Sequence, residues 1–310
     1  MNIDVRNGLG QAALCGLLAC LLGSGCSIKH YALNRAADAL SGAGGAFASD
    51  DDPELIKAAI PFSLKLMESI LSETPNHKGL LTAASSGFME FSYAFVQQEA
   101  DELESRDLAA SEAMRSRAKR LYLRAKGYGL RGLEVAHPGF TTNLLRNPKQ
   151  AVRVAKMSDV PLLYWTAASW ASAISLSKDN PELIGEMPAM TALIDRAMDL
   201  DEGFQEGALH TFMITFEMSR PATGGDPEAR ARKHFERSVA LSHGQDASPF
   251  IGLAESVTIK KQNAQEFESL LNQALAINPD ARPDNRVLNM VMQRRARWLL
   301  SRKSDLFLTE

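Results

Sequence analysis

Apolar residues recur at helical spacing through most of this 310-residue chain. Phe88, Phe91 and Phe95 repeat at i, i+3 and i+7, which places all three rings on one face of an α-helix. Similar stripes occupy four further segments, 61–73, 188–200, 267–277 and 284–300. The chain shows no convincing alternation of β-branched residues and no hairpin dipeptide between two such runs. The pattern therefore predicts an all-α fold.

Turn signals divide these helices into short pairs. Asp226 followed by Pro227 is typical of a capped helix start, and Asn278-Pro279 is typical of a turn. Segment 267–279 has the residue offsets of the second helix of a tetratricopeptide (TPR) repeat, and segments 190–197 and 231–238 repeat most of them at irregular spacing. We predict TPR-like helical hairpins stacked as an α-solenoid. An irregular helical bundle is the alternative.

The N-terminus has the pattern of a secretory signal. No charged residue lies between Arg6 and Lys29, and the apolar run 14–22 is followed by small residues that end at Cys26. All three cysteines of the chain lie in this segment, and polar sequence begins directly after Cys26. The pattern predicts a bacterial lipoprotein signal, with 1–25 removed and Cys26 acylated. Acylation at Cys20 and an uncleaved signal anchor are the alternatives.

The rest of the chain is predicted to form a short tether and one domain. Segment 26–52 includes the low-complexity stretch 41–52, which we expect to be a tether near the lipid. No Gly/Ser-rich linker divides residues 53–310, so this range is predicted to be a single all-helical domain. If cleavage precedes Cys26, acylation uses the one remaining cysteine, and no thiolate metal site is left.

Composition and motifs argue against nucleic-acid binding and catalysis. The net charge of −3 and the absence of a strongly basic domain do not fit a nucleic-acid binder. Gly127, Gly129 and Gly132 match a dinucleotide fingerprint, but a charged helical stretch precedes them instead of a strand. We interpret these glycines as allowing two helices to approach closely. The six histidines are scattered without i, i+4 spacing. We therefore predict no enzymatic activity, no cofactor and no metal site.

Basic residues are concentrated in two segments. Segment 106–131 holds eight of them against Asp107 and Glu112, and segment 282–303 holds seven against Asp284. Such segregation favours a docking face for an acidic partner or a lining for anionic solutes. A solvated helix face is the simpler alternative.

Aromatic residues gather after Pro161. Tyr164, Trp165 and Trp170 lie within seven residues, and they include two of the three tryptophans of the chain. Rigid aromatic rings are typical walls of a ligand cleft, so we predict that these three residues border one, with Tyr93 as a fourth member. The alternative is core packing between hairpins.

Six ordered segments together resemble the TRAP transporter T-component (TatT) lipoproteins. They are 59–71, 91–99, 137–140, 163–170, 224–238 and 294–300. The resemblance implies an accessory lipoprotein of tripartite ATP-independent periplasmic (TRAP) transport. It would face the periplasm and be lipid-anchored to a bacterial membrane, expected to be the outer one. The implied partner is the solute-binding protein, and the implied assembly is a homotrimer with a channel or cleft.

Organic acids are common TRAP solutes, so the resemblance also implies a cation near the aromatic cleft. Arg153 and Lys156 are the candidates, and the cluster 294–297 is a more distant one. The rival interpretation is a general TPR-like envelope scaffold lipoprotein without a ligand.

Overall fold

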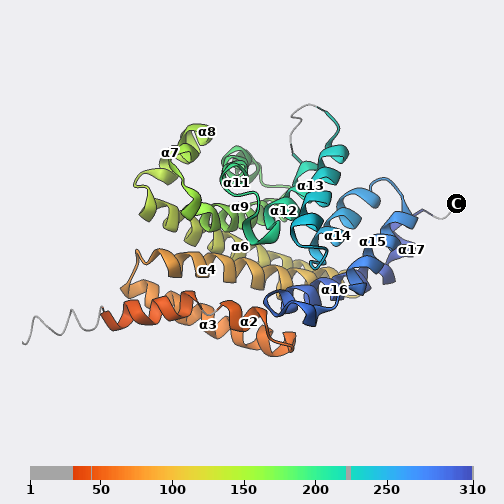
Figure 1. The fold of residues 1–310 in the computed structure, drawn as a ribbon, viewed down its shortest axis with the longest axis horizontal. Coiled ribbons are helices and arrows are strands. Elements are labelled where there is room, and N and C mark those ends of the chain that lie inside the picture. Colours follow the sequence, from red (N-terminus) through yellow and green to blue (C-terminus); the bar gives the residue numbers. More distant parts are fainter. Residues whose placement is uncertain (1–30, 43, 221–224, 309–310) are drawn as a thin grey trace, which may run out of the picture.

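The computed structural model describes residues 31–42, 44–220 and 225–308, and every regular element in these ranges is helical (Figure 1). The prediction of an all-α fold is confirmed. Signal segment 1–25 and Cys26 lie outside the described residues. The stacking of hairpins into a TPR-like solenoid stays a prediction.

The chain contains both long and short helices. Ahead of the first long one lie a helix over residues 31–41 and α2 (Gly44–Ala48). The long helices are α3 (Pro53–Glu73), α4 (Lys78–Ser92), α6 (Leu108–Ala136), α9 (Val160–Ser175), α11 (Met187–Leu200), α12 (Ala208–Glu217), α13 (Pro227–Leu241), α15 (Ala264–Ala276) and α16 (Arg286–Ser301). The shorter α-helices are α5 (Gln98–Leu103), α7 (Phe140–Arg146), α8 (Pro148–Ala151), α10 (Pro181–Gly185), α14 (Ser248–Leu253) and α17 (Lys303–Leu306).

Side-chain caps define the starts of several helices. The Asp226 carboxylate accepts a hydrogen bond from the Glu228 backbone N–H, with Pro227 at the first helical position, as predicted. Asp52 caps α3 in the same way, so this helix starts at Pro53 and passes through Pro61. The sequence stripe alone suggested a start at Pro61.

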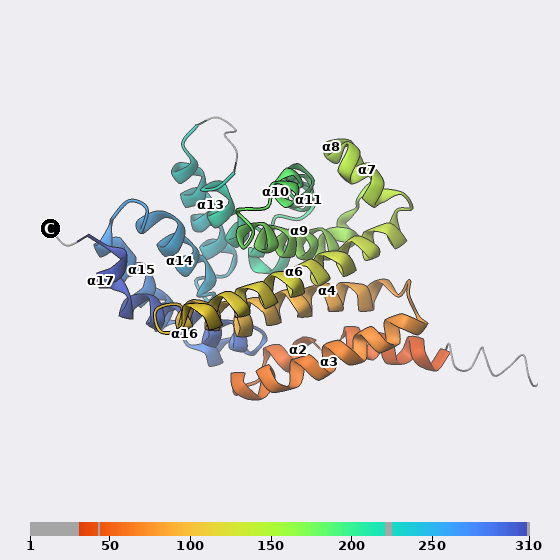
Figure 2. The same ribbon diagram turned by 180° about the vertical axis from the view of Figure 1, so that it is seen from behind.

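Two apolar cores fill the molecule. The first is built mainly by α3, α4, α6, α9 and α11, and the second by α14, α15 and α16. Elements that follow one another in the chain pack together, α3 on α4, α4 on α6 and α6 on α9. At the other end, α16 returns to contact α3 and α2 (Figures 1 and 2). The chain therefore closes on its own N-terminal part.

The described part of the expected tether is helical. Ala37 in the helix over 31–41 is fully buried, and His77 Nε2 lies 3.1 Å from an Asp38 carboxylate oxygen. Farther along, the Arg286 guanidinium donates to the Ser49 carbonyl over 2.9 Å. Alanine-rich sequence favours helix, and these contacts hold it against the domain. Residues 31–41 and 44–48 are thus helical, and the assignment of 26–52 as a tether stays a prediction.

The glycine motif is a helix-packing device, as interpreted from the sequence. A Cβ atom at Gly129 would lie 2.0 Å from Thr166 Oγ1 on α9, and one at Gly132 would lie 2.5 Å from Leu162 Cδ2. A Cβ atom at Gly127 would meet nothing within 4 Å. Close approach of α6 and α9 therefore requires two of the three glycines.

Candidate functional site

Two π-helical turns lie near each other at the junction of the two cores. The first, η1 (Tyr93–Gln97), interrupts the α4–α5 helix, and the second, η5 (Ala254–Thr258), follows α14. Tyr93 packs against both cores. Burial raises the pKa of Tyr93 to about 12, and the nearby Glu255 carboxylate adds to the rise. Single π turns occur often at functional sites, which makes this junction the first place to search.

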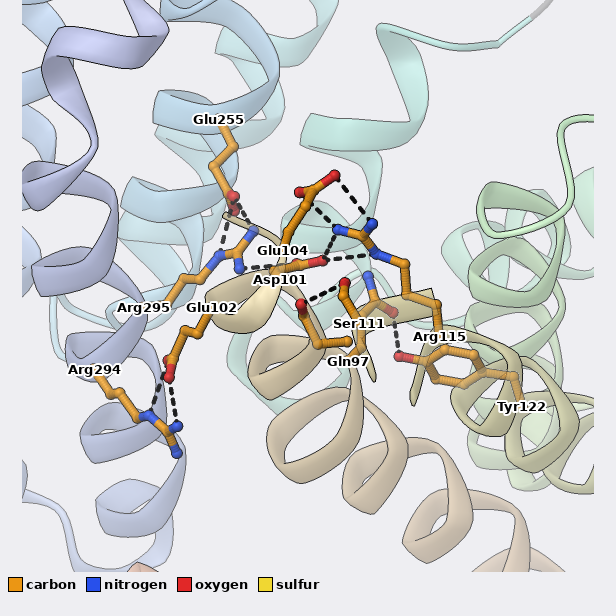
Figure 3. Close-up of polar contacts among 11 residues, drawn as sticks. Gln97, Asp101, Glu102, Glu104, Ser111, Arg115, Tyr122, Glu255, Arg294 and Arg295 are labelled. Atoms are coloured by element: carbon orange, nitrogen blue, oxygen red, sulfur yellow. Dashed lines mark hydrogen bonds and ion pairs between the residues drawn. The ribbon is translucent and has the colours of Figure 1, made fainter. Parts of the chain in front are cut away.

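An ion-pair network holds this junction together (Figure 3). The Arg295 guanidinium donates to Asp101 over 2.9 Å and to Glu255 over 2.6 Å, so it joins α16 to α5 and η5. Arg115 of α6 donates to Asp101 and to Glu104, each over 2.9 Å. These pairs join helices from both cores, and their main role is structural.

The next turn contains an amide without a well-formed hydrogen bond. Gln97 Oε1 accepts from the Tyr122 hydroxyl over 2.7 Å (Figure 3). The adjacent Gln98 is 1% exposed, yet neither its amide oxygen nor its amide nitrogen makes a well-formed hydrogen bond within the described chain, although the amide acts on the nearby Tyr93 hydroxyl. A buried amide that lacks well-formed hydrogen bonds costs free energy, so this position suits a bound water or a polar ligand group.

Tyr164 lies among aromatic rings with acidic groups nearby. Its ring centroid is 4.7 Å from that of Trp165 and 5.4 Å from that of Phe204 in η4 (Phe204–Glu206). Burial raises the pKa of the Tyr164 hydroxyl, and the charges of Glu90 and Asp246 raise it further. The charged groups that influence this hydroxyl are therefore acidic.

Glu90 combines solvent exposure with desolvation. Its side chain is exposed and has no ion pair or side-chain hydrogen bond to the described residues. The surrounding protein nevertheless desolvates the carboxyl group and raises the pKa of Glu90 to about 7. Sequence reasoning missed this residue, although an acid between Phe88 and Phe91 in an apolar helix was an available signal.

The two predicted tryptophans are buried. Trp165 is 9% exposed and Trp170 is 0% exposed. The Trp170 indole N–H donates to a Glu186 carboxylate oxygen over 2.9 Å, and Lys126 Nζ lies 3.8 Å from a ring centroid of Trp170. In this conformation Trp170 contributes packing and offers no surface that a solute can touch. Whether Tyr93, Tyr164, Trp165 and Trp170 border a cleft stays a prediction.

The candidate cations lie elsewhere. Arg153 is exposed in η2 (Val152–Val154), and Lys156 is exposed just before η3 (Met157–Asp159). Arg294 pairs with Glu102 over 2.7 Å, and it lines a cavity of about 500 Å³ together with Arg297. The other lining residues are Asp51, Pro53, Glu54, Phe95, Pro279, Asp280, Met290, Val291 and Gln293. None of the four predicted aromatic residues lines this cavity, so the cluster 294–297 and the aromatic group form separate places.

A histidine pair joins α12 and α13. His210 Nδ1 lies 2.9 Å from His234 Nδ1, so one imidazole donates and the other accepts. Burial lowers the pKa of His210, although Glu202 opposes the shift. Burial and the charge of His210 lower the pKa of His234. Double protonation would remove the acceptor and place two like charges together.

This pair predicts an acid-sensitive stability. A folded-state pKa below the unfolded value of about 6.5 means that the unfolded chain binds more protons as the pH falls through that value. The His pair's contribution to stability is thus present above about pH 6.5 and is lost below it. We expect urea unfolding to show a decrease in unfolding free energy from about pH 7.5 to about pH 5.5 that the variant His234→Gln shows less steeply.

Exposed His243 provides the control for this measurement. The variant His243→Asn should fold normally, because asparagine tolerates the positive φ of 52° at this position. It should keep the wild-type pH slope, because the His210–His234 pair is intact. Equal slopes in wild type and His234→Gln would contradict the assignment. The carboxylates titrate in all three proteins, so their contribution to the pH dependence of the unfolding free energy cancels when the slopes are compared.

In the described ranges no helix is both long enough and apolar enough to cross a membrane.

Comparisons with known proteins assign the chain to a family by two matches. A family model described as "TRAP transporter T-component" matches residues 49–307. An uncharacterized protein of Treponema pallidum (strain Nichols) is 31% identical over 309 residues, which covers 94% of this chain and 95% of that protein. The chain therefore belongs to the TRAP transporter T-component family, which gives it an accessory role in TRAP transport.

Proposed function

We propose that this chain is a non-enzymatic, periplasm-facing lipoprotein that holds the solute-binding component of a TRAP system. The family match over residues 49–307 carries the proposal. The N-terminal pattern that ends at Cys26 supports acylation there and attachment to the periplasmic side of a membrane, the outer membrane being the proposed one. TPR-like stacking and a homotrimer belong to the same proposal.

The proposed solute cleft is bordered by Tyr93 and Tyr164, with Trp165 and Trp170 behind them. Two observations support it. Glu90 is exposed, and the surrounding protein raises the pKa of its carboxyl group. Gln98 presents a buried amide close to Tyr93, and the Tyr93 hydroxyl is the one side-chain group that acts on it in the described ranges.

The charges near this cleft bear on the class of solute. The groups that act on the Tyr164 hydroxyl are Glu90 and Asp246, while Arg153 and Lys156 are exposed in another segment. A carboxylate solute would be repelled by ionised acids. We therefore propose that the part of the solute near Tyr164 is neutral or cationic, and that an organic acid would bind there best when Glu90 is protonated.

Direct binding separates this proposal from the scaffold alternative. Purified chain lacking its signal should bind a purified TRAP solute-binding protein of the same organism, as measured by calorimetry. The variant Tyr164→Phe should weaken binding of a solute to this chain. The variant Glu90→Gln should weaken binding of a cationic solute and strengthen binding of an organic acid, because it removes the negative charge at this position. Both variants should leave the protein partner bound. If the wild-type chain does not bind the solute-binding protein, the alternative of a general scaffold lipoprotein would be favoured. If both variants bind the solute with the wild-type affinity, the proposed cleft would be contradicted.

Lipid attachment is tested independently. The variant Cys26→Ser should lose incorporation of a labelled fatty acid, because the only cysteine left after cleavage is replaced. Equal label in the variant and in wild type would move the acylation site to Cys20.

A further inference from the structure

Three arginines of α6 form a row on its surface. Arg117, Arg124 and Arg131, hereafter the arginine row, are exposed and stand seven residues apart. A rise of about 1.5 Å per residue separates successive members by about 10.5 Å, and seven residues bring each one back to nearly the same helix face. Figure 2 shows α6 running across the near side of the molecule, with α4 and α3 beside it.

Each guanidinium of the row lies over an aromatic ring. The Arg117 guanidinium carbon is 5.8 Å from the Phe91 ring centroid. The corresponding distances are 5.3 Å from Arg124 to Phe88 and 5.6 Å from Arg131 to Tyr128. A ring attracts the cation without accepting its in-plane N–H groups. The aromatic contacts therefore restrain the side chains and leave most of their donors available.

The row also lacks the close carboxylate partners that other arginines have. In the described ranges no carboxylate lies within ion-pair distance of Arg117 or Arg131, and the Arg131 guanidinium donates only to the Pro75 carbonyl, over 2.9 Å. Arg124 lies 3.5 Å from Glu68. That carboxylate already accepts from Lys65 over 2.5 Å and from Tyr128 over 2.7 Å.

Arginines at the junction of the two cores behave differently. Arg115, which precedes Arg117 on the same helix, pairs closely with Asp101 and Glu104, and Arg294 and Arg295 pair with carboxylates over 2.6–2.9 Å. The chain thus neutralises the arginines at the junction of its cores. In the row, Arg117 and Arg131 have no carboxylate partner in the described ranges, and Arg124 has only the shared Glu68.

We propose that the arginine row is a docking surface for an acidic helix of a partner protein, with one carboxylate on every second turn facing each guanidinium. A second helix laid along α6 repeats its side chains at the same seven-residue interval, so the spacings match. Guanidinium forks held in place suit discrete carboxylates. The proposal does not depend on the solute cleft.

A pair of synthetic peptides tests the spacing. The first is a helical peptide of about 21 residues with glutamate at three positions seven residues apart, and the second has the same composition with the three glutamates adjacent. Fluorescence anisotropy at low ionic strength should show the spaced peptide binding the wild-type chain several-fold more tightly. The triple variant Arg117→Gln, Arg124→Gln, Arg131→Gln should weaken that binding about tenfold, since three exposed ion pairs are lost.

A second triple variant controls for net charge. Arg146, Lys149 and Arg153 are exposed on α7, α8 and η2, and changing all three to glutamine removes the same charge elsewhere. This variant should weaken binding less than about twofold. Circular dichroism of both variants should match the wild type, because all six side chains are exposed. Thermal melts should show only the small loss that follows from removing three exposed cation–π contacts in the first variant.

Three results would overturn the proposal. Equal affinity for the two peptides would mean that spacing is not recognised. Equal weakening by the two triple variants would mean that the peptide responds only to the net charge of the protein and not to the arginine row. Binding to phosphatidylglycerol vesicles that depends on the row, without binding of the spaced peptide, would assign the row to a lipid surface.

Discussion

Trp170→Ala is expected to lower the free energy of unfolding by about 3–5 kcal/mol, because it removes a large buried side chain and leaves a cavity. The ring is 0% exposed, and the substitution also removes the indole N–H that donates to Glu186. Urea unfolding followed by circular dichroism measures the loss. Phe62→Ala is the matched aromatic control, because Phe62 is 73% exposed and its loss should cost less than about 0.5 kcal/mol.

The same variant decides between packing and solute contact at this position. If Trp170 only packs, the folded fraction of Trp170→Ala should keep the wild-type affinity for partner and solute. A melting temperature close to that of the wild type, together with weakened binding, would instead place Trp170 at the cleft and contradict the packing role.

Gly129→Ala should lower the free energy of unfolding, although it adds only one methyl group. The new Cβ atom would lie 2.0 Å from Thr166 Oγ1, a distance that real contacts do not reach, so α6 and α9 must move apart. Overpacking of this kind costs about 1–3 kcal/mol and occasionally more, and we expect the upper end because α9 also packs against α11 and α4.

Gly127→Ala, two residues earlier on the same helix, is the matched control. Its Cβ atom would meet nothing within 4 Å, so only helix propensity changes. Alanine should stabilise this site by about 0.5–1 kcal/mol. Opposite signs for the two variants in thermal or urea unfolding would support the packing role of the motif. Destabilisation by both variants would mean that α6 is strained at Gly127 for another reason.

Local patterns were enough to predict the helices and several of their contacts. Apolar spacing identified α4 and α16, and Asp226-Pro227 identified the start of α13. The missing strand before Gly127 was enough to exclude a dinucleotide site and to favour helix packing. These features depend on residues within a few turns of one another, because helical hydrogen bonds and caps form between near neighbours.

The sequence alone could not predict which polar side chains contact one another. The ion pairs Arg294–Glu102 and Arg295–Asp101 join residues more than 190 positions apart. They form only because α16 returns to the N-terminal half of the domain. For the same reason the aromatic segment could be located in the sequence, but the burial of Trp170 and the exposure of Glu90 could not be foreseen.

Helical periodicity thus determined by itself that the chain is all-α, and the order of its segments indicated the family. The tertiary structure decided that Gly129 and Gly132 bring α6 onto α9 and that Trp170 is in the core. It also decided that, in the described ranges, Arg117 and Arg131 have no carboxylate partner and Arg124 has only the shared Glu68. The physical reason is one of range. Backbone hydrogen bonding acts between neighbours in the sequence, whereas burial and ion pairing depend on which helix faces are packed together.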